Sequence, residues 1–340
     1  MDTLLERPTA GRTGRLAWAD LLRVLATFAV VLLHTSTTWL ALAEEGSAEW
    51  TALMAWDGLT RWCVPVFVLL SGAFLLDPNK PLTVRFLLRS RLPRILAALL
   101  AWGFFYNLIY FRKAGVAGVR NALLLTLRGQ TEYHLWYLYM LLGLYLLTPV
   151  LRGLVRGCSR RELEWLLALW FLAGLLLPTV LSYFPSVGAQ SWLKQLELPL
   201  IGGYPGYYVA GYYLRTYDLR PHVRYAVYAL GLSGLAATLA LGSDVYGYLT
   251  PNVACTACAL FLLCRQCRLR PSRVAGLSDC SFGVYLSHVF FLMLLNHFGL
   301  TTLRFTSWLS APLLSLAVFF CAAGTARALR KLPVVGAYIT

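Results

Sequence analysis

Three ionisable residues lie inside the first long apolar stretch of the chain. Residues 16–43 are long and apolar enough to cross a bilayer, for which about 20 residues suffice, yet they include Asp20, Arg23 and His34. Ionisable groups inside a membrane are costly and mark functional sites. Arg23 and His34 are separated by about three helical turns, so they project from one helix face about 16 Å apart along the axis. Asp20 is expected to pair with Arg23 from three positions earlier.

The alternative interpretation of this stretch is structural. Arg23 would extend toward the cytosolic surface, and His34 would be a packed, hydrogen-bonded core residue. Arg23 lies about two turns into the apolar run and His34 well beyond it. We therefore favour the functional interpretation, in which Asp20, Arg23 and His34 form a catalytic set.

The composition is that of an integral membrane protein. Of 340 residues, 59% are hydrophobic and 13% are charged, whereas a soluble domain has about 25% charged residues. The net charge of +15 is distributed as membrane topology requires, so no nucleic-acid partner is expected. The first apolar run is longer than that of a signal peptide, and no small-residue cleavage site follows it. It is expected to remain as the first span.

The hydropathy pattern predicts an all-α integral membrane protein with about ten transmembrane helices. The expected spans are 16–43, 57–76, 92–111, 133–151, 163–181, 198–214, 222–242, 249–264, 280–299 and 308–326. Most Lys and Arg residues fall in loops on the side of the N-terminus, which places both termini in the cytosol. The organisation is then a cytosolic tail over 1–15, a transmembrane domain over 16–331 and a cytosolic tail over 332–340. Within the outer loop 112–132, GVRNALLLTLRG could form an interfacial amphipathic helix.

This orientation brings further polar and aromatic residues toward His34. Span four begins at the outer face, level with His34, and span nine enters from the inner half. The residues expected to line an acceptor pocket are His134, Trp136, Tyr139, Tyr285 and His288. A neutral imidazole with an ordinary pKa near 6.5 can act as a general base. For Trp136 and Tyr139, the alternative is a place in the interfacial aromatic belt.

A group of arginines marks the cytosolic end of span three. Arg89, Arg91 and Arg94 lie within RFLLRSRLPRIL. They could be ordinary positive-inside charge, and this is the preferred interpretation for the neighbouring Arg85. Three guanidinium groups at a helix mouth also suit a polyphosphate, through bidentate charge-assisted hydrogen bonds. A phosphorylated cytosolic donor and a histidine near the outer side predict group transfer across the membrane.

The cysteines do not indicate a metal site. Cys255 and Cys258, and then Cys264 and Cys267, have the spacing of a zinc or iron–sulfur motif. The first pair, however, lies within an apolar span, and the second lies at its cytosolic end without a loop to fold around a metal. No metal and no resident cofactor are expected.

Five segments, in order along the chain, resemble membrane acyltransferase family 3, the O-acyltransferases that modify bacterial envelope polysaccharides. WADLLRVLATFAVVLLH, with Arg23 and His34 eleven residues apart, resembles the family's opening helix. VPVFVLLSGAFLL resembles its second-helix motif, which ends here at Ser71 and Gly72, and RFLLRSRLPRIL resembles the start of helix three. HLWYLYMLLGLYLLTPVLR and SFGVYLSHVFFL resemble later motifs of the branch that includes the enterobacterial common antigen O-acetyltransferase.

The resemblance implies acyl-CoA as a cytosolic co-substrate and His34 as the catalytic histidine, with Arg23 as its motif partner. It implies that Arg89, Arg91 and Arg94 hold the nucleotide phosphates, and we place Ser71 with them in the donor site. Acetyl is the expected acyl group, and a saccharide or lipid-linked glycan is the expected acceptor. The expected location is the bacterial inner membrane, with multiple spans; homo-oligomerisation is left open.

Two departures from the family limit what carries over. Other branches have an HxWSL-type motif followed by a Glu, whereas this chain has HLWYLYM without one, so no catalytic carboxylate is assigned there. The fused extracytoplasmic domain that some branches have after the last span is not expected here. The competing hypothesis is a transporter or lipid-binding membrane protein that uses the same polar path. Transporters commonly contain inverted repeats, and no repeat is evident here.

Overall fold

The computed structural model describes residues 15–184, 202–267, 274–333 and 336–340, and all regular elements in these ranges are helical. In chain order they are α1 (Ala17–Leu40), α2 (Ala48–Thr60), α3 (Cys63–Leu75), α4 (Val84–Phe86), η1 (Leu87–Arg91), α5 (Leu92–Tyr110), α6 (Gly115–Leu127), η2 (Tyr133–Leu135), α7 (Trp136–Gly157), α8 (Arg160–Leu169), η3 (Trp170–Leu176), α9 (Leu177–Tyr183), α11 (Tyr204–Thr216), α12 (Pro221–Leu241), η5 (Gly242–Val245), α13 (Pro251–Arg265), α14 (Ala275–His297), α15 (Ser307–Leu329) and α16 (Gly336–Ile339). The all-α prediction is confirmed.

Eight helical runs in the described part of the chain are long and apolar enough to cross a membrane. They overlap eight of the ten expected spans; the second run, Ala48–Leu75, begins nine residues earlier than the expected span 57–76. The other two expected spans, 198–214 and 249–264, correspond to the shorter helices α11, of 13 residues, and α13, of 15 residues. The expected outer loop 112–132 contains α6, also of 13 residues. The tail up to residue 14 and most of the residues between α9 and α11 lie outside the described residues.

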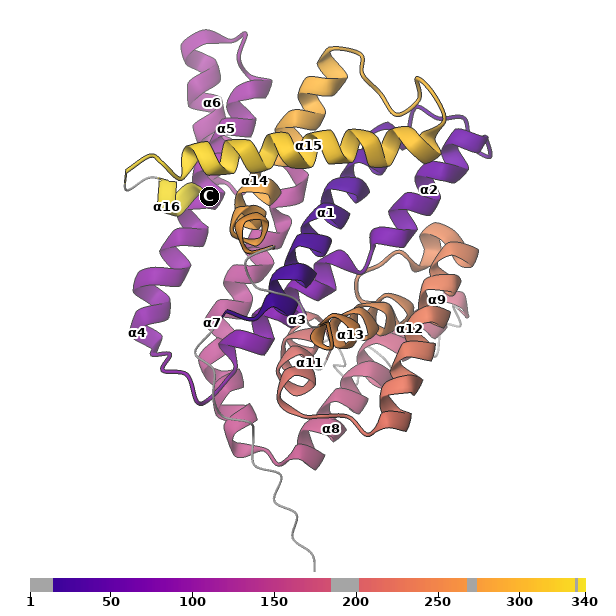
Figure 1. Ribbon diagram of the computed structural model, residues 1–340. Coiled ribbons are helices and arrows are strands. Elements are labelled where there is room, and N and C mark those ends of the chain that lie inside the picture. Colours follow the sequence, from indigo (N-terminus) through magenta and orange to yellow (C-terminus); the bar gives the residue numbers. More distant parts are fainter. Residues whose placement is uncertain (1–14, 185–201, 268–273, 334–335) are drawn as a thin grey trace, which may run out of the picture.

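Helix α1 occupies the middle of the helical bundle (Figure 1) and packs against α2, α3, α13, α14 and α15. Its contacts with α14 show that the two helices run side by side in the same direction. Near their beginnings, Arg23 donates a hydrogen bond to Ser278 at 2.8 Å. Near their ends, the indole of Trp39 donates to Asn296 at 3.1 Å. This parallel pairing is what the predicted topology requires of spans one and nine.

Helices α3 and α11 cross with their backbones in contact. A Cβ atom added to Gly72 would lie 1.8 Å from the carbonyl oxygen of Tyr208, and one added to Gly211 would lie 1.9 Å from that of Leu69. Only glycine fits at either position, because any side chain would overlap a backbone atom. Small residues allow this close approach between helices in lipid. The Ser71-Gly72 sequence therefore has a packing role through its glycine.

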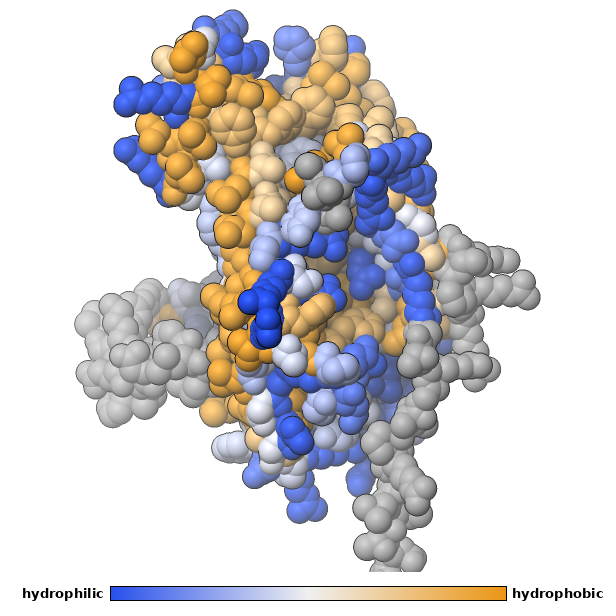
Figure 2. Space-filling model, turned by 90° about the vertical axis from the view of Figure 1, so that its left-hand side faces the viewer, coloured by the Kyte–Doolittle hydropathy of each residue, from blue (hydrophilic) through white to orange (hydrophobic). Residues whose placement is uncertain are grey.

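The last described residues return to the bundle. Residues 336–340 pack against α5, where Arg94 donates to the Thr340 carbonyl at 2.7 Å and Trp102 donates to the Ile339 carbonyl at 3.0 Å. Figure 2 shows the face of the molecule on this side. Hydrophilic side chains gather around a hollow in its middle, and mainly apolar side chains cover the projecting end.

Candidate functional site

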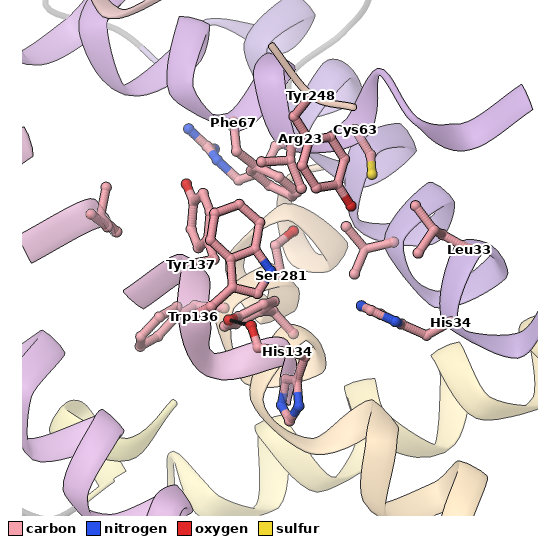
Figure 3. Close-up of a pocket in the computed structure, with 15 residues that line it drawn as sticks. Arg23, Leu33, His34, Cys63, Phe67, His134, Trp136, Tyr137, Tyr248 and Ser281 are labelled. Carbon is pink, nitrogen blue, oxygen red and sulfur yellow. Dashed lines mark hydrogen bonds between the residues drawn. The ribbon is translucent and has the colours of Figure 1, made fainter. Parts of the chain in front are cut away.

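A cavity of about 170 Å³ lies between α1, α3, α7 and α14 (Figure 3). Both Arg23 and His34 line it, as their shared helix face predicts. His134, Trp136 and Tyr285 also line it, which brings residues from three distant parts of the chain to one space. The cavity therefore contains an imidazole suited to proton transfer and a cation separated from it by three helical turns.

Arg23 is held by a buried carboxylate at the beginning of α1. Asp20 is 3% exposed and accepts hydrogen bonds from Arg23 at 3.0 Å, Ser278 at 2.6 Å and Arg15 at 2.5 Å. The expected Asp20–Arg23 pair is therefore present. Arg15 also bonds Asp279 at 2.8 Å, so the network joins the beginnings of α1 and α14. This arrangement fixes the Arg23 guanidinium at one end of the cavity.

Three histidines meet at the other end. The ring centroids of His34 and His288 are 5.1 Å apart, those of His134 and His288 are 5.2 Å apart, and those of His34 and His134 are 6.4 Å apart. His134 and His288 are buried, at 1% and 0% exposure. His288 Nδ1 lies 2.7 Å from the carbonyl oxygen of Tyr285. The predicted convergence of His34 and His134 is present, and His288 completes the cluster.

Aromatic side chains form the wall beside this cluster. Trp136 stacks on Tyr248, with centroids 5.7 Å apart and planes at 21°, and both line the cavity. The hydroxyl of Tyr285 donates to the His134 carbonyl at 2.5 Å, which fixes η2 against α14. Amphipathic rings that line a cavity provide flat apolar faces with polar edges. Such a wall suits a ligand that has both apolar faces and hydroxyl groups.

Of the expected pocket residues, Tyr139 and His288 do not line the cavity, and neither do the expected donor residues, Ser71 included. Tyr139 is 39% exposed, and its hydroxyl donates to the Gly129 carbonyl at 3.3 Å, so it packs on the outer loop. Ser71 donates to the Phe67 carbonyl of its own helix at 2.8 Å. Ser71 lies one turn from Phe67, which does line the cavity. Its hydroxyl is thus used within the helix.

The three arginines of the expected donor site differ in their surroundings. Arg89 and Arg91 are exposed and end the π-helical turn η1. Arg94 is half-buried, bonds the Thr340 carbonyl, and lies over the ring of Phe282 at 5.5 Å. Arg94 is therefore engaged by the last residue of the chain, whereas Arg89 and Arg91 keep their side chains exposed at the start of span three.

Sequence reasoning missed several residues of the site. Tyr248, Cys63 and Ser281 line the cavity but belong to no spacing pattern that would have singled them out. Tyr248 follows η5 in a short loop, and only the packing of that loop beside α7 brings it to Trp136. The signal that could have found Ser281 is its segment, SFGVYLSH, which also contains Tyr285 and His288.

A second buried ion pair lies near the C-terminal end of α2, where it meets α3. Asp57, which is 2% exposed, accepts a hydrogen bond from Arg61 one turn later. The Arg61 guanidinium lies 4.9 Å from the ring centroid of Tyr246 and 5.9 Å from that of Tyr248. These cation–π contacts connect α2 to the loop that carries Tyr248, and so they support the aromatic wall from behind.

Glu132 precedes the histidine cluster on the outer loop. Its carboxylate accepts a hydrogen bond from the Tyr110 hydroxyl at 2.9 Å. Burial raises the pKa of Glu132 above its ordinary value. Among the described residues, no group of three or more His, Cys, Asp or Glu side chains is arranged to hold a metal ion.

Comparison with known proteins gives the family. The model of the acyltransferase 3 family, described as an acyltransferase domain, matches residues 16–327. This range contains all the cavity residues and almost the whole expected transmembrane domain. Searches of curated proteins and of solved structures found no match. Because the family model covers most of the chain, the protein belongs to acyltransferase family 3 and is a membrane acyltransferase.

Proposed function

We propose that the protein transfers an acyl group, most simply acetyl, from cytosolic acyl-CoA to a hydroxyl group of an envelope saccharide or lipid-linked glycan. The acceptor would bind from the outer side of the bacterial inner membrane. Family membership supports acyl transfer and favours it over a transporter or lipid-binding role. The donor, the acetyl group, the acceptor and the inner-membrane location are parts of the proposal.

The observation that carries this proposal is the single cavity lined by both Arg23 and His34. Asp20 holds Arg23 at one end, and the exposed Arg89 and Arg91 would add positive charge on the same, cytosolic side. An anionic donor would be attracted to that end. The acyl group would then enter the cavity toward His34, and the Trp136–Tyr248 wall would contact the acceptor.

The reaction needs one proton transfer in each direction. As a general base, His34 would take the proton of the acceptor hydroxyl while the oxygen attacks the thioester carbonyl. The carbon–sulfur bond would break, and the CoA thiolate would take that proton back from the imidazolium. In the covalent alternative, His34 would first accept the acyl group itself and release CoA before the acceptor attacks. Both routes use the same cavity face of His34.

The donor site can be tested by titrating purified protein with CoA. Losing one hydrogen bond to a charged group costs about 1.5–3 kcal/mol, which corresponds to roughly 10- to 150-fold in affinity. Arg89→Ala and Arg91→Ala should each weaken CoA binding by that factor, with partial rescue by Lys and a smaller effect at high salt. Arg85→Ala is the matched control from the same segment and should bind CoA normally. Wild-type affinity in both test variants would refute this donor site.

A further inference from the structure

One hydroxyl group of the cavity makes no hydrogen bond to any described residue. Ser281 is 4% exposed and lines the cavity, and its buried Oγ has no partner in the described part of the chain. A hydroxyl inside a helix can bond the carbonyl four residues earlier, as those of Thr27, Ser71 and Ser287 do here. The Ser281 hydroxyl does not, so its bonding capacity is available to a molecule that occupies the cavity.

The position of Ser281 along α14 lies between the two ends of the cavity (Figure 3). It comes three residues after Ser278, which accepts a hydrogen bond from Arg23 at 2.8 Å. It comes seven residues before His288, whose ring centroid is 5.1 Å from that of His34. With a rise of about 1.5 Å per residue, Ser281 is about 4–5 Å beyond the level of Ser278 and about 10 Å before that of His288. A ligand that extends from Arg23 to His34 would therefore pass this hydroxyl.

An acyl donor with a pantetheine arm carries an amide group at about this distance from its thioester. Five bonds join the thioester carbon to the nearest amide carbon, and they span about 6 Å when extended. With the thioester carbon about 3–3.5 Å from His34, that amide falls about 9–10 Å from the imidazole, close to the level of Ser281. An amide that is buried without a partner is costly. A hydroxyl both donates and accepts hydrogen bonds, so it can satisfy either the carbonyl or the N–H of the amide.

We propose that Ser281 is a binding residue for the acyl donor, and that its hydroxyl forms a hydrogen bond with the amide nearest the thioester of a pantetheine arm. This inference rests on the proposed function, which supplies the class of donor. The bond fixes how far the arm enters the cavity. The thioester, which follows this amide after two carbons, is thereby held beside His34.

Three thioester donors separate this contact from a general effect of the substitution. Acetyl-CoA contains the whole arm, S-acetyl-N-acetylcysteamine contains only the nearest amide, and S-pentyl thioacetate has a chain without an amide. One neutral hydrogen bond corresponds to about two- to tenfold in kcat/KM. Ser281→Ala should therefore lower kcat/KM by that factor for the first two donors and leave it unchanged for the third. Ser287→Ala, whose hydroxyl bonds its own helix, is the matched control and should equal wild type with all three.

Two outcomes of this comparison would overturn the proposal. An equal loss with every donor is the result that a contact between Ser281 and the acceptor would give. Wild-type kcat/KM of Ser281→Ala with every donor would remove Ser281 from substrate binding altogether.

The second measurement does not require acyl transfer. Purified protein is titrated with CoA and with adenosine 3′-phosphate 5′-diphosphate, which is the nucleotide of CoA without the arm. Ser281→Ala should weaken CoA binding by about two- to tenfold and leave nucleotide binding unchanged, and Ser287→Ala should equal wild type for both. Unchanged CoA binding by Ser281→Ala would refute the donor contact even if transfer is active. Absence of transfer by the wild type, with the expected binding pattern, would refute only the proposed function.

Discussion

Substitution of Asp20 tests whether Arg23 is held in place by the network at the beginning of α1. Asp20→Asn keeps the shape of the side chain but removes the negative charge that bonds Arg15, Arg23 and Ser278. Removing one partner of a buried ion pair costs about 3–5 kcal/mol. The side chains of Arg15 and Arg23 are 41% and 33% exposed, so both regain some hydration. We therefore expect a loss of about 2–3 kcal/mol, below the range for a fully buried pair and in the upper part of the range for hydrogen bonds to charged groups.

The matched control is Asp279→Asn, because Asp279 also bonds Arg15. Its side chain is 50% exposed, and an exposed pair contributes about 0–1 kcal/mol. Both variants are compared with wild type by thermal unfolding in detergent and by acyl transfer in vesicles. Asp20→Asn should unfold at a clearly lower temperature and lose activity as Arg23 is released from its position, and Asp279→Asn should differ little in either. Equal effects of the two substitutions would refute the assignment of Asp20 as the anchor of Arg23.

Three further predictions concern packing, titration and topology. Gly72→Ala should destabilise the protein by about 1–3 kcal/mol through overpacking. Gly153→Ala should not destabilise it, because the space around Gly153 is open. Equal unfolding temperatures of the two variants would contradict the close crossing of α3 and α11. Burial raises the pKa of Glu132, so the folded state holds this proton more tightly than the unfolded state does. The resulting stabilisation is complete below the ordinary pKa of 4.5 and is lost as the pH rises through the raised pKa. Glu132→Gln should flatten this part of the pH–stability profile, and an unchanged profile would argue against the raised pKa. In a background without native cysteines, a cysteine at Glu45 should react with an impermeant reagent in intact cells and one at Asn79 only after permeabilisation; labelling of both from one side would contradict the topology.

The helical architecture follows from sequence because lipid imposes strong constraints. A long apolar run can satisfy its backbone hydrogen bonds in a membrane only as a helix or a closed barrel. Each expected span therefore corresponds to a helical segment, although the start of the second differs and α11 and α13 are short. The helical positions of Asp20, Arg23 and His34 also follow from spacing alone, since all three belong to α1. The Asp20–Arg23 pair and the common helix face of Arg23 and His34 could be predicted without knowledge of tertiary structure.

The remaining parts of the site depend on packing between helices, which spacing does not encode. Trp136 and Tyr139 are three residues apart and begin the same span, but Trp136 lines the cavity and Tyr139 packs on the outer loop. The contact of Arg94 with residue 340 depends on the return of α16 to α5. Tyr248 reaches the cavity because Arg61 and Trp136 contact its ring.

The most direct test of the account is transfer of labelled acetyl from acetyl-CoA to envelope glycans by reconstituted wild type and His34→Ala. A general base contributes about 10²- to 10⁴-fold to the rate, so the variant should lose at least about a hundredfold. It should still bind CoA, because the expected phosphate contacts of Arg89 and Arg91 do not involve His34, and it should unfold at the wild-type temperature. Near-normal transfer by a folded His34→Ala protein would contradict the central role of His34.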